Sequence, residues 1–136
     1  MNSKKLSILL AAVVLIAAQI ACAVGEPTLS NIRTAKDEDG TQLSSVFVPS
    51  DTIYIVGDLA NAQAGNKVTS RWYIESAEGF DPNFFIEEAS IDITESGINS
   101  VYFFYPAPTD GFPVGTYKVE MYFNNALVDT VRFTVQ

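Results

Sequence analysis

Apolar and polar residues alternate along most of the chain beyond Gly25, which is the pattern of half-buried β-strands. The alternation is clear at 68–74, where Val68, Trp72 and Ile74 fall on one face. Seven further candidate strands with the same character cover residues 31–36, 44–48, 52–59, 90–94, 99–105, 116–123 and 127–135. No segment beyond the first 25 residues keeps a helical period, so the pattern predicts an all-β domain.

The connections between these segments are rich in residues that favour turns. Asp39-Gly40 and Asn124-Asn125 both tolerate the positive φ that tight hairpins need. We expect Asn124-Asn125 to be a two-residue hairpin between the predicted strands 116–123 and 127–135. Longer loops are expected at residues 60–66, 77–85 and 106–113. Seven to eight strands separated by turns in about 110 residues predict an antiparallel two-sheet sandwich.

The N-terminal residues have the features of an export signal. Lys4 and Lys5 precede an apolar run of about 13 residues, shorter than the roughly 20 that a membrane-spanning helix needs. We therefore expect residues 1–25 to be a signal peptide with a helical apolar core, followed by a short tether at 26–30 and the sandwich domain at 31–136.

Cys22 is the only cysteine in the chain and follows the apolar run. Together with the preceding Gln19-Ile20-Ala21 it resembles the end of a bacterial lipoprotein signal, in which the cysteine becomes the first mature residue and carries lipid. Ordinary cleavage before Val24 or Glu26 is the alternative, and Cys22 is then discarded with the signal. The protein is therefore expected to be exported, either as a membrane-anchored lipoprotein or as a secreted or periplasmic domain.

The composition excludes several classes of catalyst and partner. Without histidine, and with at most one cysteine after cleavage, the chain lacks the residues of His-based acid–base catalysis, Ser-His and Cys-His pairs and the usual zinc and copper sites. Removing Lys4 and Lys5 from the eight basic residues leaves six, against 16 acidic ones. This balance disfavours nucleic acids and anionic membranes as partners, so we expect membrane contact only through the signal peptide or a lipid anchor.

Asp37, Glu38 and Asp39 stand directly before Gly40, and oxygen-rich loops of this kind bind calcium in extracellular modules. The segment is not an EF-hand, because the ligand positions at both ends of such a loop would be apolar residues. The three carboxylates are a candidate calcium site, and a solvated turn is the alternative. We expect no other cofactor.

Aromatic residues make up 12% of the chain. Strand alternation sends Tyr102 and Phe104 away from the core, and Tyr73 and Tyr122 also fall opposite the faces assigned to the core. An exposed row of Tyr73, Tyr102, Phe104 and Tyr122 on one sheet is a candidate binding surface for a protein or a carbohydrate. The alternative is that these rings form cross-strand pairs that stabilise the sheet without binding a ligand.

The segment 115–120, Gly-Thr-Tyr-Lys-Val-Glu, resembles the strand that carries the tyrosine corner in immunoglobulin-like domains, with Val119 where the second cysteine would stand. Trp72 resembles the core tryptophan of these domains, and Ile55 stands in the place of the first cysteine. The whole chain looks like the small exported bacterial modules of the immunoglobulin-like or fibronectin-III-like kind. This resemblance implies a fold and a location, and it implies no reaction.

The sequence thus predicts a non-catalytic binding or interaction module of the cell envelope or the extracellular space, whose partner is a protein or a glycan. We assign no catalytic residue. The alternative is a small exported hydrolase or enzyme accessory domain that uses a pair of carboxylates, which a cleft holding two such groups would favour.

Overall fold

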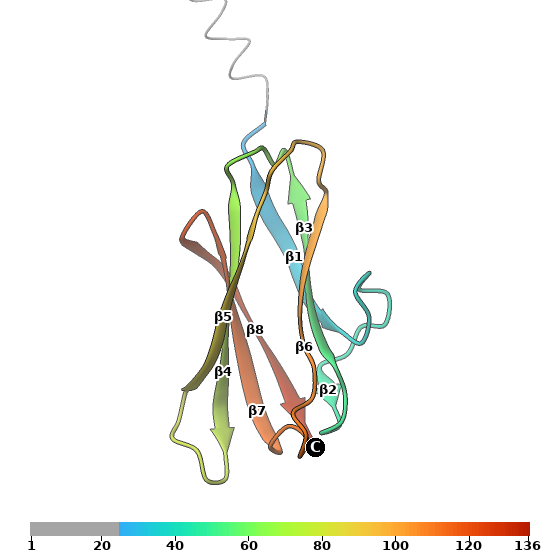
Figure 1. The fold of residues 1–136 in the computed structure, drawn as a ribbon, viewed down its shortest axis with the longest axis vertical. Helices are drawn as coiled ribbons and strands as arrows, with labels where there is room; N and C mark the ends of the chain where they lie inside the picture. The colour runs from blue at the N-terminus through green and yellow to red at the C-terminus, as the bar shows by residue number, and fades with distance from the viewer. Residues whose placement is uncertain (1–24) are drawn as a thin grey trace, which may run out of the picture.

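The computed structural model describes residues 25–136, which form eight β-strands in two sheets (Figure 1). The three-stranded sheet has the order β1-β3-β6 and consists of β1 (Thr28–Ala35), β3 (Ile53–Ala60) and β6 (Ser100–Tyr105). The five-stranded sheet has the order β2-β8-β7-β4-β5 and consists of β2 (Val46–Phe47), β4 (Lys67–Ala77), β5 (Phe84–Asp92), β7 (Gly115–Phe123) and β8 (Ala126–Val135). The prediction of an all-β protein of two sheets is confirmed for this part of the chain. The expected signal helix and Cys22 lie outside the described residues.

Neighbouring strands pair in antiparallel fashion, except that β2 runs parallel to β8. The strand β1 starts at one end of the sandwich, and the C-terminus lies at the other end (Figure 1).

One hydrophobic cluster drawn from both sheets fills the space between them. Trp72 of β4 is 4% exposed, and its ring lies 5.9 Å from that of Tyr105 on β6 and 6.2 Å from that of Phe133 on β8. Its indole N–H donates a hydrogen bond of 3.0 Å to the hydroxyl of the fully buried Ser70. Trp72 and Ile74 therefore face the core, as the alternation predicts.

The hairpin prediction is confirmed in detail. Asn124 and Asn125 have φ of 49° and 67°, and the flanking residues Phe123 and Ala126 pair with each other. The side-chain oxygen of Asn124 also accepts a hydrogen bond of 2.9 Å from the backbone N–H of Lys67. Asparagine tolerates the left-handed conformation because its short polar side chain bonds locally, so this pair suits a two-residue turn.

Several predicted boundaries are wrong. β1 begins at Thr28, so most of the expected tether at 26–30 belongs to a strand. The predicted strand at 44–48 shortens to the two residues of β2. The largest difference is at β5, which starts at Phe84, whereas the sequence predicted a strand only at 90–94 and a loop at 77–85. A β-bulge explains this error: Trp72 pairs with Glu87 and Tyr73 with Phe85, so Ile86 is an extra residue that breaks the period of two.

Tyr117, near the start of β7, ties the proline-rich connection 106–114 to the core. Its side chain is 1% exposed, and its ring stacks on that of Phe133 at 5.0 Å. Its hydroxyl donates a hydrogen bond of 2.6 Å to the backbone carbonyl of Pro113, four residues earlier. Burial raises the pKa of Tyr117 to about 12, because the ionised phenolate would lose its hydration.

Candidate functional site

Three aromatic side chains cluster on the outer face of the three-stranded sheet. On β6, Tyr102 and Phe104 are 40% and 55% exposed, while Val101 and Phe103, which alternate with them, are buried. Tyr54 of β3 pairs with Phe104, and its ring lies 5.8 Å from that of Phe104 and 6.2 Å from that of Tyr102. We call Tyr54, Tyr102 and Phe104 the aromatic patch. Alternation along β3 directs Tyr54 away from the buried Ile53 and Ile55, but only the pairing of β3 with β6 brings it to the other two rings.

The predicted single row of four aromatic residues is wrong. Tyr73 of β4 and Tyr122 of β7 belong to the five-stranded sheet, whereas Tyr102 and Phe104 belong to the other sheet. Alternation along a strand shows which side chains point away from the core, but it does not show which sheet the strand joins. The four residues therefore lie on two opposite faces of the sandwich.

The rings on the five-stranded sheet are packed against cations. The guanidinium of Arg71 lies 5.7 Å from the ring of Phe85 and 6.0 Å from that of Tyr122, and the ammonium of Lys118 lies 5.1 Å from the ring of Tyr73. The Tyr73 and Phe85 rings also meet edge to face at 5.6 Å. This arrangement fits cross-strand pairs that stabilise the sheet.

The acidic loop at 36–42 borders the aromatic patch. The carboxylate of Asp37 accepts hydrogen bonds from the hydroxyl and the N–H of Thr41 and from the N–H of Gln42. These bonds, that of the Thr41 hydroxyl first, hold the pKa of Asp37 below its ordinary value. At the patch itself, the negative charge of Glu38 raises the pKa of Tyr102. Glu38 therefore places a carboxylate beside an exposed aromatic ring.

The candidate calcium ligands do not converge. Asp37 uses both carboxylate oxygens to close its own loop. Within residues 25–136, no three His, Cys, Asp or Glu side chains are grouped closely enough to hold a metal ion together. The structure thus brings Asp37, Glu38 and Asp39 to one loop without bringing their carboxylates to one point.

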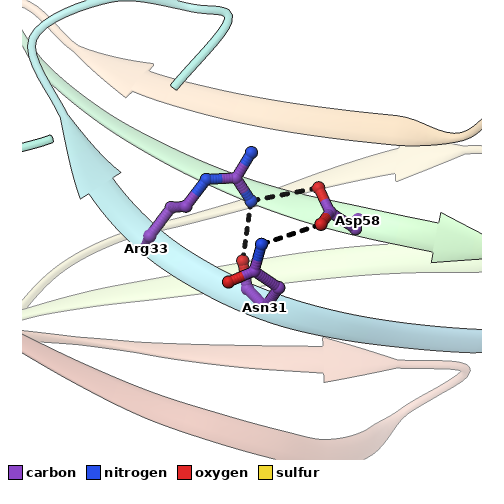
Figure 2. Close-up of polar contacts among 3 residues, drawn as sticks. All are labelled: Asn31, Arg33 and Asp58. Carbon is purple, nitrogen blue, oxygen red and sulfur yellow. Dashed lines mark hydrogen bonds and ion pairs between the residues drawn. The ribbon is translucent and has the colours of Figure 1, made fainter. Parts of the chain in front are cut away.

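A β-bulge in β1 holds a polar cluster that joins β1 to β3 (Figure 2). Ser30 pairs with Asp58 of β3 and Arg33 pairs with Val56, so Asn31 and Ile32 together face a single residue of β3. Asn31 takes a positive φ of 50° to make this possible.

Three hydrogen bonds hold this cluster. Arg33 donates from Nη1 to a carboxylate oxygen of Asp58 at 3.0 Å and to the carbonyl of Asn31 at 2.7 Å, and the Asn31 amide donates to the other Asp58 oxygen at 2.8 Å (Figure 2). The bond from Asn31 and the nearby Arg33 guanidinium hold the pKa of Asp58 below its ordinary value. The charges of Arg33 and Asp58 are thus engaged with each other, and the cluster fixes the shape of the bulge.

An apolar groove with a volume of about 570 Å³ lies between β5 and β6, the two facing edges of the sheets. Its apolar lining includes Ala89, Ile91, Ile93, Ile98, Val101 and Phe103. A second hollow of about 510 Å³ lies between the same two strands, nearer the connection 106–113, and is lined in part by Ile86 and Tyr105. The aromatic patch thus adjoins a groove through their common strand, β6.

The alternative function, a carboxylate-dependent hydrolase, requires a hollow that holds two carboxyl groups. The apolar groove has one carboxylate in its lining, that of Asp92. The second hollow between β5 and β6 also has one, that of Asp110. A smaller hollow over the five-stranded sheet has only that of Glu88, and a fourth, beside β1 and β8, has none. Glycosidases need two carboxyl groups facing one another across the substrate, and none of these four hollows holds such a pair.

Comparison with known proteins shows similarity of fold alone. No protein-family model and no curated protein matches the sequence. Among solved structures, an alkylpurine DNA glycosylase from Pseudomonas fluorescens bound to DNA matches 82% of this chain with a TM-score of 0.50 and 12% identity. A β-glucosidase from Listeria innocua in complex with laminaribiose matches 81% with a TM-score of 0.50 and 10% identity. This chain spans only 31% and 16% of those two chains.

In the part of the chain from residue 25 to residue 136, no helix is long and apolar enough to cross a membrane.

Proposed function

We propose that this protein is an immunoglobulin-like module of the cell envelope or the extracellular space, which binds a protein or a glycan through the aromatic patch and catalyses no reaction. The observation that carries the proposal is the exposure of Tyr102 and Phe104 side by side on a regular sheet face, in contact with Tyr54. Neighbouring exposed aromatic rings supply a large rigid contact area at a small loss of conformational entropy, which favours recognition.

Three features support the immunoglobulin-like assignment. The hydroxyl of Tyr117 bonds to the backbone a few residues upstream, as the tyrosine of a tyrosine corner does. Trp72 lies in the core between the sheets, and Ile55 and Val119, which stand in the places of the two cysteines, are fully buried on opposite sheets. Apolar packing at these two positions replaces the disulfide, and a domain of this size does not require one.

The contrast between the two outer faces supports placing the binding surface on the three-stranded sheet. On the five-stranded sheet, Arg71 and Lys118 already lie against the aromatic rings. No such cation lies against the three rings of the aromatic patch among the interactions of residues 25–136. The patch therefore offers ring surface that the domain itself does not use.

The binding role is testable by site-specific cross-linking. A photoreactive phenylalanine analogue at position 104 is expected to cross-link to envelope or extracellular material of the natural host. The same analogue at position 85 is the matched control, because Phe85 is 46% exposed but lies on the other sheet. Equal cross-linking from both positions, or none from position 104, would contradict the proposal.

Removal of the rings should weaken binding of the cross-linked partner. For the variant that combines Tyr102→Ser with Phe104→Ser, we expect a loss of about 2 kcal/mol or more of binding free energy, as is usual for aromatic residues at the centre of an interface. Both rings point outward, so the melting temperature serves as the control for folding and should change little. Unchanged affinity in the folded variant would place the binding surface elsewhere.

The proposed location depends on the fate of Cys22. We propose that export ends either in a lipid-anchored protein whose first residue is Cys22 or in a released domain. Mass spectrometry of the mature N-terminus from the natural host distinguishes the two, since a diacylated or triacylated cysteine adds fatty-acyl mass and a terminus at Val24 or Glu26 does not. An intact Met1 in the mature protein would contradict export through this signal.

A further inference from the structure

Four strands lie at the edges of the two sheets, and three of them have features that oppose pairing with another chain. β1 is interrupted by the bulge at Asn31, and β2 is only two residues long. β5 has a bulge at Ile86 followed by Glu87 and Glu88. Bulges, short length and edge charges are the usual means by which proteins prevent strands from other chains from joining a sheet.

β6 has none of these features. Its six residues, Ser-Val-Tyr-Phe-Phe-Tyr, include no charge and no proline, and they pair with β3 without any shift of register. Within residues 25–136, β3 is its only strand partner. The free side of β6 therefore presents a regular row of backbone N–H and C=O groups, which is a template for one more strand.

The surroundings of this edge suit the two faces of an added strand. Side chains of such a strand point alternately to the two faces of the sheet. Those directed inward would enter the apolar groove of about 570 Å³, beside Ile91, Val101 and Phe103. Those directed outward would lie beside Tyr102 and Phe104. The groove and the aromatic patch are then two sides of one binding site.

Charge determines which partner fits. Glu38 lies beside Tyr102, Asp92 lines the groove, and all 16 acidic residues of the chain but only six basic ones lie within residues 25–136. A second copy of this protein would bring the same negative charge to the edge, which opposes self-pairing. Lysine or arginine on the outward face of the added strand would instead lie near the carboxylate of Glu38. It would also lie near the rings of the aromatic patch, which contact no cation of residues 25–136.

From this geometry we propose that β6 accepts an extended segment of another protein as a fourth strand of the three-stranded sheet, and that the segment carries apolar side chains inward and lysine or arginine outward. The inference rests on the proposed binding function and specifies its mode and its partner.

The test uses the mature protein and a synthetic peptide of about seven residues that alternates lysine and valine, the length of an ordinary strand. In hydrogen–deuterium exchange, the peptide is expected to slow exchange of those β6 amides that are not bonded to β3, by about tenfold or more at saturation. Binding should weaken as salt is added. A peptide that alternates glutamate and valine should give no protection, and equal protection by that peptide would overturn the charge assignment.

Two N-methylated peptides provide the matched control. Methylating every valine nitrogen blocks one edge of the peptide strand, and methylating every lysine nitrogen blocks the other edge. One of the two should lose affinity by about tenfold or more and the other should keep it, because only one edge bonds to β6. Equal affinities would overturn strand addition.

The remaining outcomes separate this inference from the proposed function. Peptide-induced changes in the NMR signals of Tyr102 and Phe104 without protection of β6 amides would overturn strand addition and leave the binding surface in place. Protection of β6 that grows with protein concentration in the absence of peptide would overturn the inference in favour of a second copy. No effect of the peptide on either observable would overturn the inference, while cross-linking from position 104 tests the proposed function independently.

Discussion

Replacing Trp72 with alanine is expected to lower the free energy of unfolding by about 3–5 kcal/mol, as is usual when a large buried aromatic side chain is deleted. The ring lies between the two sheets, in contact with Tyr105 of one and Phe133 of the other, so the cavity would open at the centre of the sandwich. The change also removes the indole N–H that bonds to the buried hydroxyl of Ser70. That hydroxyl would then lack this partner, which adds to the loss.

Urea denaturation followed by circular dichroism measures this effect, since Trp72 is the only tryptophan and its fluorescence disappears in the variant. Phe104→Ala is a suitable control, because it deletes a comparable ring from the outer face and is expected to change stability by less than about 1 kcal/mol. Equal effects of the two substitutions would contradict the placement of Trp72 between the sheets.

The success of the sequence-based predictions depends on how local their physical causes are. The inward facing of Trp72 follows from a period of two, and the hairpin at Asn124-Asn125 follows from two residues that tolerate positive φ. Both causes lie within a few neighbouring residues. β5 was mostly missed because Ile86 sits in a bulge, and the bulge depends on how β5 pairs with β4.

The candidate site shows the same limit. Tyr102 and Phe104 are directed outward by the alternation of β6 alone, and the sequence identifies them. Their neighbours come from elsewhere in the chain: Tyr54 by the register between β3 and β6, and Glu38 by the fold of the loop after β1. Non-local pairing likewise separates Tyr73 and Tyr122 from this face. A surface built from three segments is therefore recognisable only once the strand order is known.

The order of strands also accounts for the open edge. After β5 the chain crosses from the five-stranded sheet to the three-stranded one, and in the part of the chain that the structure describes no strand lies beside β6 on the side away from β3. The groove remains there because the facing edges of the two sheets are not bridged by a further strand of residues 25–136. Binding at this position would thus complete a layer of the sandwich.

Above pH 10 the protein is expected to lose about 2–3 kcal/mol of stability through Tyr117. Burial raises the pKa of this phenol in the folded protein to about 12, whereas a tyrosine in the unfolded chain ionises near pH 10. Between these two values the unfolded state has released its proton and the folded state has not, so a rise in pH favours unfolding. The contribution is fully present below pH 10 and is lost as the pH approaches 12.

Tyr117→Phe isolates this effect. The variant loses the hydrogen bond to the Pro113 carbonyl and is expected to be less stable than the natural protein by about 1 kcal/mol at neutral pH. Its stability should nevertheless fall less steeply between pH 10 and pH 12, because position 117 no longer titrates. Tyr73 and Tyr102, whose pKa values are also raised, titrate in both proteins and largely cancel in the difference. Parallel profiles of unfolding free energy against pH would show that the Tyr117 hydroxyl is not buried in the folded protein.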